Sequence, residues 1–475
     1  MRLIFRVDSS SKIGIGHLAR CLKLANIFNY TDIHFVCKNL DGNANFLIKE
    51  NYKLHLIKSN NELRDAFEFI KILKKEISVD QNKDYIILDN YELKQKWEKK
   101  IKPYSKKLLT IDDRFRSSNA DFFLNTNWFF EKNENFLKYR LSNLLLGPLY
   151  GLINKKVKKK NKRFITIYFG SNDEYNLTSQ TLKHLIRLKI KNIIIILGHN
   201  FNFIQEIRKL IKGKEHIKII HKFKNLSAIF SKTRFFIGAG GSTSTERFLY
   251  QIPSLICPVA ENQQLISRFL HDKNFQQNLD KNFFFNFNKW KKAFLNLKKK
   301  EKILIKNLSY LSFEDSTKRI KNIFNNKGSN FKLIKFNEKF KKIMFNFVNQ
   351  PDAIKSRFNQ KYIQLNEHEK FITKLKNNSN EIIYLGMFNN VISGFIRFSK
   401  KNKKDMYIDI YCCPTIRGNF FAKKMLFGGI KDILRTNKKI TFIANVKKNN
   451  FKSINFFKKY FRKKGNINNI STFEY

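Results

Sequence analysis

Residues 3–28 read LIFRVDSSSKIGIGHLARCLKLANIF. The stretch opens with a mostly apolar run, Leu3–Val7, of the kind that forms a buried strand. A polar turn with Gly14 and Gly16 follows, and apolar residues then recur at helical spacing as far as Phe28. We therefore predict a strand, a glycine-containing turn and a helix that begins near His17. The free backbone N–H groups at such a helix start favour an anion.

The same alternation of short apolar runs and helix-length segments continues through the first two thirds of the chain. It is typical of βαβ units on parallel sheets. We predict an α/β protein with two Rossmann-like domains, followed by a C-terminal α+β domain. The further strands predicted in the first two domains are Ile33–Cys37, Tyr85–Leu88, Leu108–Ile111, Phe164–Phe169, Ile193–Leu197, Ile217–Ile220, Phe235–Ile237 and Ser254–Cys257.

Two changes in composition suggest domain limits. The basic run Lys155–Arg163 resists burial and predicts a hinge, and the polar run Asn325–Asn330 interrupts the periodicity. Asn389-Asn390 predicts a hairpin turn between two later strands. We expect domains at 1–157, 158–328 and 331–475. The strands predicted in the last domain are Glu381–Met387, Val391–Ser399, Met406–Cys412 and Ile440–Val446, around a helix from about Phe420.

The chain is strongly basic, with 93 Lys and Arg against 38 Asp and Glu and a net charge of +55. A hydrophobic fraction of 42% and an aromatic fraction of 15% exclude a mainly disordered protein. The charge fits either A+T-rich codon usage or nucleic-acid binding. Lysines are spread along the whole chain and no RNA-recognition signature is present, so an RNA-binding protein is kept only as an alternative of another class.

Location and metal content follow from weaker signals. The five cysteines show no metal-ligand spacing, which suits a reducing compartment, and no metal is expected. The longest aliphatic run, Ile193–Leu197, is far shorter than the roughly 20 residues of a membrane helix. The N-terminus has no signal-peptide pattern. We expect a cytoplasmic monomer that does not insert into a membrane.

Two glycine-rich turns carry the candidate chemistry of the first two domains. An exposed His17 beside a bound anion can act as a general base on water. The alternative is a histidine that caps a helix or packs in a core. The second turn, FIGAGGSTSTE (236–246), offers Ser242 and Thr243 to phosphate oxygens and Glu246 to ribose hydroxyls, unless it is an ordinary connection. A third turn, YFGSND (168–173), adds backbone donors.

Together these stretches resemble a known enzyme family. GAGGSTSTE with the following IPSL and AENQ resembles the nucleotide-binding half of MurG-like enzymes with the glycosyltransferase B fold. RVDSSSKIGIGHLARCLKLA is more similar to the PseG family, the UDP-sugar hydrolases of pseudaminic acid biosynthesis. So are ILDNYELKQKWE, which ends at residue 98, TIDDRFR (110–116) and LLGPLYGLI (145–153). The resemblance spans about residues 1–325.

The resemblance implies hydrolysis of UDP-2,4-diacetamido-2,4,6-trideoxy-β-L-altropyranose to the free sugar and UDP, without a cofactor. It implies that His17 activates the attacking water, with inversion. Asn90 and Ser171 depart from the family pattern. A UDP-sugar glycosyltransferase is the alternative. The residues expected to bind the UDP-sugar are Asp8, Gly14, Gly16, Tyr91, Gly170, Ser171, Gly241, Ser242, Thr243, Glu246, Asn262 and Gln263.

The last domain resembles the GNAT acetyltransferases, because MYIDIYCCPTIRGNFFAKKML (406–426) is similar to their acetyl-CoA motif. The resemblance implies acetyl-CoA-dependent N-acetylation of the 4-amino sugar nucleotide. Phe420 replaces a glycine of the motif and Phe457 a tyrosine acid, so a decayed domain is the alternative. The expected acetyl-CoA residues are Arg417, Gly418, Asn419, Phe421, Ala422 and Asn450, and His368, if it is not a surface histidine, and Asn359 are expected on the acceptor side.

Overall fold

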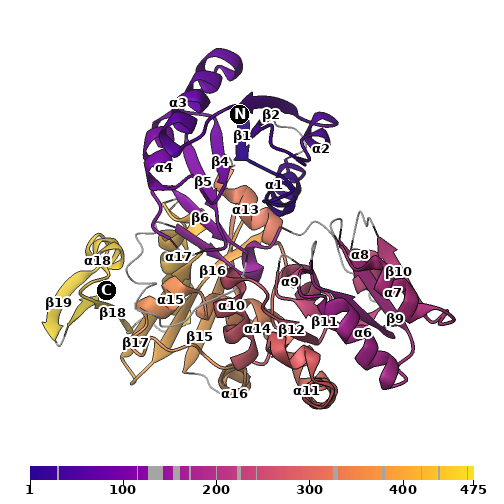
Figure 1. The fold of residues 1–475 in the computed structure, drawn as a ribbon. Helices are drawn as coiled ribbons and strands as arrows, with labels where there is room; N and C mark the ends of the chain where they lie inside the picture. Colours follow the sequence, from indigo (N-terminus) through magenta and orange to yellow (C-terminus); the bar gives the residue numbers. More distant parts are fainter. Residues whose placement is uncertain are drawn as a thin grey trace. The chain divides into compact units, whose positions relative to one another are not determined.

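The first sheet of the computed structural model holds seven parallel strands in the order β3-β2-β1-β4-β5-β6-β7 (Figure 1). The chain adds β2 and β3 on one side of β1 and then returns to add β4 on the other side. The strand order therefore reverses between β1 and β4. The strands span Arg2–Val7 (β1), Asp32–Lys38 (β2), Lys53–Ile57 (β3), Tyr85–Asp89 (β4), Lys107–Ile111 (β5), Phe122–Asn125 (β6) and Asn143–Leu146 (β7).

The second sheet repeats this plan with six parallel strands in the order β10-β9-β8-β11-β12-β13. Here the strand order reverses between β8 and β11. All five residues of β9 are buried, as expected for a parallel strand covered on both faces. The strands span Phe164–Tyr168 (β8), Ile193–Leu197 (β9), Ile217–His221 (β10), Thr233–Ala239 (β11), Ser254–Cys257 (β12) and Gln277–Asn278 (β13).

Amphipathic helices cover these two sheets and supply the large side chains of their cores. Trp97 packs against Phe69 beside the first sheet, and Trp290 stacks on Phe294 beside the second. The helices are α1 (Gly16–Ala25), α2 (Phe46–Lys49), α3 (Glu62–Ile72), α4 (Gln95–Ile101), α6 (Leu177–Arg187), α7 (Ile204–Ile211), α8 (Ser227–Phe230), α9 (Ser244–Leu249), α10 (Glu261–Asp272), α11 (Phe287–Lys299) and α12 (Glu301–Leu308).

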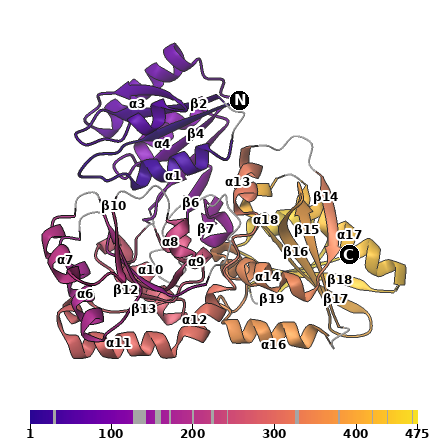
Figure 2. The same cartoon turned by 90° about the vertical axis from the view of Figure 1, so that its right-hand side faces the viewer.

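The third sheet is mixed and runs in the order β14-β15-β16-β17-β18-β20-β19 (Figure 2). Only the β17–β18 pair is parallel among the described pairs, and α17 packs against β14 to β17. The elements are α13 (Ser316–Phe324), β14 (Phe331–Lys335), α14 (Lys341–Val348), α15 (Pro351–Ser356), α16 (Leu365–Lys376), β15 (Glu381–Phe388), β16 (Val391–Lys400), β17 (Asp405–Cys412), α17 (Phe421–Thr436), β18 (Thr441–Lys447), α18 (Phe451–Lys458), β19 (Arg462–Ile467) and β20 (Ile470–Glu474).

The chain divides into two compact units, Met1–Phe313 and Glu314–Tyr475. The first unit contains both parallel sheets and the second contains the mixed sheet, which confirms the predicted fold class. No helix among the described residues has the length and apolar character needed to cross a membrane. The structure describes residues 1–28, 32–114, 116–126, 143–152, 161–170, 173–198, 201–221, 226–241, 243–324, 330–376, 380–418, 420–436, 439–467 and 469–475.

The limits predicted at 157 and 328 remain predictions. Most of the hinge predicted at Lys155–Arg163 and most of the polar run at Asn325–Asn330 lie outside the described residues. The predicted hairpin turn is confirmed, because Phe388 pairs with Val391 and both asparagines are left-handed, with φ of 50° at Asn389 and 61° at Asn390. Several strands were not predicted from the sequence: β3, β6, β7, β13, β14, β19 and β20.

A buried ion network lies at the carboxyl end of β1 in the first sheet. Arg6 of β1 is fully buried and pairs with Asp8 at 2.6 Å and with Asp65 of α3 at 2.6 Å. Asp65 also accepts hydrogen bonds from Ser59 and Trp97. Burial opposes the charge on Asp65, but the Arg6 guanidinium and these donors hold its pKa below the ordinary value.

The turn before α17 contains a residue in an unfavourable backbone conformation. Phe420 has φ of +56° and its side chain is 71% exposed. Bulky residues rarely adopt this left-handed region, whereas glycine and asparagine enter it easily. The position therefore has the backbone of a glycine site although it carries phenylalanine.

Replacing Asp65 by alanine should destabilise the first unit by about 3–5 kcal/mol, because Arg6 is then buried with part of its charge uncompensated. Urea unfolding followed by circular dichroism measures this loss. Asp80→Ala, which removes a carboxylate from the exposed Lys83–Asp80 pair, is the control and should have a much smaller effect. Equal losses for the two variants would contradict the assigned role of the network.

Phe420→Gly should stabilise the second unit relative to Asn390→Gly by about 1 kcal/mol. Both substitutions add the same freedom to the unfolded chain, but only the first removes a bulky side chain from a left-handed residue. Thermal unfolding of the full chain measures the difference. A lower melting temperature for Phe420→Gly than for the asparagine control would show that the phenylalanine is not strained.

Candidate active site

The topology brings two sequence-distant loops together at the carboxyl edge of the first sheet. β1 and β4 are neighbours, with Val7 opposite Asp89, so the loops that follow these strands begin side by side. The first carries Asp8 and leads to His17, and the second carries Tyr91. In open parallel sheets, ligands bind at the position where the strand order reverses, and this is that position.

His17 is held by a buried carboxylate. Its Nδ1 lies 2.5 Å from Oδ1 of Asp89, a fully buried residue at the end of β4. With the proton on Nδ1 donated to Asp89, the lone pair of Nε2 is left to accept a proton from a ligand. The sequence predicted an exposed imidazole, and this was wrong: the side chain is only 11% exposed because α1 begins against β4.

Asp89 bonds two side chains from one turn of α1, His17 and Arg20. Arg20 donates from Nε to Oδ2 at 2.5 Å and from Nη2 to Oδ1 at 2.7 Å, beside the bond to His17. Burial alone would raise the pKa of Asp89, but the Arg20 guanidinium and the His17 bond hold it below the ordinary value. Asp89 is therefore charged at neutral pH.

Tyr91 packs directly against the imidazole of His17. Its ring packs edge-on against His17 with the centroids 4.4 Å apart, and its hydroxyl donates to Asp113. Burial and Asp113 raise the pKa of this phenol, which keeps it protonated. The Arg114 guanidinium lies 3.7 Å from the ring centroid. Tyr91 is thus fixed beside the imidazole, and its contact with the sugar of the UDP-sugar stays a prediction.

Asp8, a predicted site residue, has several partners within the protein. Asp8 is 4% exposed, and its carboxylate accepts from Arg6, from the backbone of Lys38 and from the Asn90 amide at 2.8 Å. Asn90 therefore ties the two loops to each other. Gly14, with φ of +78°, provides the tight turn that returns the chain to α1, and Gly16 is the first residue of that helix.

The second sheet repeats this arrangement. β8 and β11 are neighbours, so the turns after Tyr168 and Ala239 meet at the carboxyl edge. Gly170 has φ of +102°, and the Gln263 amide lies near Gly241, 3.8 Å from where a Cβ on that glycine would stand. These turns present backbone groups at one place. Ser171, Ser242 and the side chain of Asn262 lie outside the described part of the chain.

Glu246, predicted to bind ribose hydroxyls, is paired in this structure with a lysine of α1. Its Oε1 lies 2.5 Å from Nζ of Lys23, whose side chain is half exposed. Thr243 immediately precedes α9, the helix that carries Glu246. The ion pair joins the helix that carries His17 to the helix that follows the second glycine-rich turn.

In the second unit, β17 and β18 pair only from Asp405–Thr441 to Tyr407–Ile443 among the described residues. Beyond these positions β17 continues to Cys412 with no further described pair to β18. Gly418 has φ of +88°, and α17 begins three residues later, with Phe421 and Ala422 in its first turn. Asn419 lies outside the described residues.

The side chains predicted around this turn have protein partners. Arg417 pairs with Asp352 and donates from Nη2 to the Cys412 carbonyl at 2.9 Å. Asn450 caps α18 by accepting from the Ser453 backbone at 3.3 Å. The first backbone N–H groups of an α-helix such as α17 have no carbonyl partner within the helix, so they are the donors that a bound anion could use.

The two residues expected on the acceptor side, His368 and Asn359, differ in their burial. His368 is 3% exposed, not a surface residue, and its Nε2 lies 2.8 Å from the Lys341 carbonyl. Burial lowers its pKa. Asn359 is exposed, near the end of the α15 segment. Phe457 is buried among Phe461 and Phe473, so it packs in a core.

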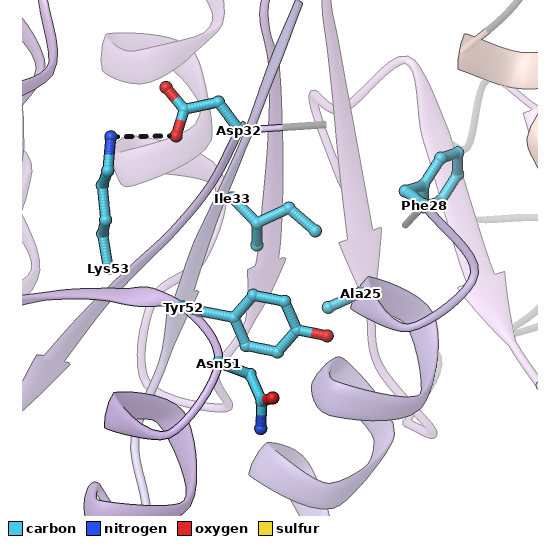
Figure 3. Close-up of a pocket in the computed structure, with 7 residues that line it drawn as sticks. All are labelled: Ala25, Phe28, Asp32, Ile33, Asn51, Tyr52 and Lys53. Atoms are coloured by element: carbon cyan, nitrogen blue, oxygen red, sulfur yellow. Dashed lines mark ion pairs between the residues drawn. The ribbon is translucent and has the colours of Figure 1, made fainter. Parts of the chain in front are cut away.

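A separate pocket of about 260 Å³ lies at the opposite end of the first sheet. Figure 3 shows Asp32 and Lys53 at its wall, joined by an ion pair of 3.1 Å, with Tyr52 close by. These residues stand at the amino ends of β2 and β3. The pocket is therefore distinct from the carboxyl-edge site. Among the described residues, no cluster of three or more His, Cys, Asp or Glu side chains could hold a metal ion.

Sequence reasoning missed three members of the His17 site: Asp89, Arg20 and Asp113. Asp89 lies 72 positions after His17 in the chain, and only strand adjacency joins them. A signal existed, because Asp89 directly follows the predicted strand Tyr85–Leu88. Arg20 is three residues after His17, on the same face of the helix. Asp89 and Arg20 could therefore have been assigned to the His17 site once the pairing of β1 with β4 was known.

Known proteins match the two units separately. Residues 351–461 match the family model described as the acetyltransferase (GNAT) family. UDP-2,4-diacetamido-2,4,6-trideoxy-beta-L-altropyranose hydrolase of Campylobacter jejuni is 26% identical over 286 residues, 58% of this chain and 98% of that protein. An uncharacterized protein of Methanocaldococcus jannaschii is 27% identical over 278 residues, 54% of this chain. The match spans only 55% of the length of this archaeal relative.

A solved structure supports the fold of the larger part. MurG of Acinetobacter baumannii aligns with a TM-score of 0.50 and 12% identity, over 68% of this chain and 98% of that one. At this identity the likeness concerns the fold alone, and it confirms the predicted glycosyltransferase-B-like pair of Rossmann-like domains. The chain thus combines a region similar to a UDP-sugar hydrolase of Campylobacter jejuni with a segment, residues 351–461, that matches the acetyltransferase (GNAT) family model.

Proposed function

We propose that the first unit hydrolyses UDP-2,4-diacetamido-2,4,6-trideoxy-β-L-altropyranose to the free sugar and UDP, in the biosynthesis of pseudaminic acid. The observation that carries this proposal is the His17–Asp89 pair at the point where the first sheet reverses its strand order. The hydrolase relative from Campylobacter jejuni supplies the substrate class. In this proposal the second glycine-rich turn would receive the nucleotide.

In the proposed reaction, His17 Nε2 takes a proton from a water molecule as its oxygen attacks the anomeric carbon. The bond from that carbon to the phosphate oxygen breaks, and its electron pair stays with UDP. Attack from the side opposite UDP inverts the anomeric centre. The proton on His17 then returns to solvent. The negative charge of Asp89 stabilises the imidazolium formed in this step.

The leaving UDP would be held at the second sheet. Backbone groups of the 170 and 240–241 turns, with the hydroxyl of Thr243, would meet the diphosphate as its charge develops. Glu246 would accept hydrogen bonds from the ribose hydroxyls in place of its ion pair with Lys23. Tyr91 and Asn262 would lie near the sugar. No cofactor is predicted for this step.

We propose a second activity for the other unit, namely acetyl transfer from acetyl-CoA to the 4-amino group of the precursor sugar nucleotide. The family match over 351–461 and the short parallel pairing of β17 with β18 support this activity. The amides from Gly418 to Ala422 would receive the pyrophosphate of acetyl-CoA. The two reactions would then be consecutive, and both are expected in the cytoplasm.

The hydrolase is tested by incubating the full chain with the UDP-linked diacetamido sugar and following UDP and the free sugar by NMR. Release of both, without any acceptor present, is expected. Release that requires an added acceptor would instead show a glycosyltransferase, the activity that the MurG-like fold also accommodates. Product configuration at the anomeric carbon, read from the first spectra, tests the inversion.

His17→Asn should lower kcat on the order of 10²–10⁴-fold, the usual contribution of a general base. UDP affinity should stay close to that of the wild type, because the imidazole contacts water and not the nucleotide in the proposed mechanism. Turnover by NMR and UDP titration by calorimetry measure the two effects. Equal losses of turnover and UDP affinity would make His17 a binding residue.

Asp89→Asn should lower kcat on the order of 10²-fold or more, because an amide no longer fixes the imidazole tautomer or stabilises its charged form. Asp84→Asn is the matched control: this aspartate is also buried, on the same sheet, but pairs with Arg2 at the amino edge. Both variants are compared by kcat and by thermal unfolding. A loss of activity in both, in proportion to stability, would contradict a specific role for Asp89.

A further inference from the structure

Arg247 is a buried cation that the proposed reaction does not use. It lies in α9, immediately after Glu246, and none of its side chain is exposed. Among the described residues, its Nε and Nη1 have no hydrogen-bond partner. A guanidinium has five N–H donors, so most of its hydrogen-bonding capacity is unused.

One nitrogen of Arg247 connects it to the second glycine-rich turn. Nη2 donates to Oγ of Ser244 at 2.8 Å, and that hydroxyl donates to the Gly241 carbonyl at 2.8 Å. The guanidinium carbon lies 4.8 Å from the ring centroid of Phe236, which belongs to β11. The guanidinium therefore lies between the Gly241 turn, which it reaches through Ser244, and Phe236 of the apolar core.

The charge of Arg247 lacks a buried counter-ion in the described part of the chain. Burial lowers its pKa to about 9, opposed by the neighbouring Glu246, so it remains charged at neutral pH. The Glu246 carboxylate is itself paired with Lys23. Burying a charge without a partner is costly, and an apolar residue of similar size would often be more stable there.

We propose that Arg247 is a positioning residue whose counter-ion is the diphosphate of the bound nucleotide. It supports the 240–241 turn through Ser244 and places a positive charge behind the position where the phosphates bind. This inference rests on the proposed function, because it needs a nucleoside diphosphate at that turn. It accounts for a buried charge that costs stability in the unliganded protein.

The test compares UDP with uridine, because only UDP carries the diphosphate. We expect Arg247→Met to weaken UDP binding at least tenfold, measured by calorimetry, and to leave uridine binding, measured by saturation-transfer NMR, within twofold of the wild type. The melting temperature of the free protein should stay the same or rise. Arg247→Lys, which keeps the charge, should restore most of the UDP affinity.

Three outcomes would overturn the inference. Unchanged UDP affinity in Arg247→Met, equal losses for UDP and uridine, or a failure of Arg247→Lys to restore UDP binding each leave Arg247 with a structural role only. If Arg247→Met does not fold, the lysine variant decides by its ratio of UDP to uridine affinity. Wild-type protein that does not bind UDP would refute the proposed function itself, whereas UDP binding that is indifferent to Arg247 refutes only this inference.

Discussion

The buried carboxylate of Asp89 is the interaction on which the candidate active site depends. It ends β4, accepts two hydrogen bonds from Arg20 and holds Nδ1 of His17 at 2.5 Å. A carboxylate in this position would be costly without cationic partners, so the start of α1 and the end of β4 stabilise each other. The same contact sets the orientation of the imidazole. Local stability and the placement of the proposed base therefore depend on one interaction.

The two parallel sheets divide the proposed reaction between them. Each reverses its strand order once, between β1 and β4 and between β8 and β11, and each places glycine-containing turns at that point. The first reversal gathers titratable side chains around His17, whereas the second gathers backbone groups around Gly170 and Gly241. A base that activates water needs the first kind of environment, and a departing diphosphate needs the second. The sheets are alike in topology and differ in the chemistry of their edges.

Local patterns were sufficient to predict the fold class, because buried parallel strands such as Ile193–Leu197 are continuous apolar runs. They were insufficient for edge strands: Lys53–Ile57 alternates with basic residues and is partly exposed, and Asn143–Leu146 is very short. His17 could be predicted from its turn. Its partner Asp89 could not, because it lies 72 positions further along the chain, beyond two other strands, and only sheet pairing shows which strand returns beside β1.

Two fully buried arginines show how partners separate a structural charge from one that serves a ligand. Arg6 is bonded to Asp8 and Asp65, and these neighbours raise its pKa against the effect of burial. Arg247 is equally buried, yet it donates to one hydroxyl, and burial lowers its pKa. Both keep their charge at neutral pH, but only Arg6 has its counter-ions in the fold. Because Arg247 has no carboxylate partner in the described fold, a bound ligand is a reasonable source of its counter-ion. The diphosphate of a nucleotide bound at the 240–241 turn would supply that negative charge.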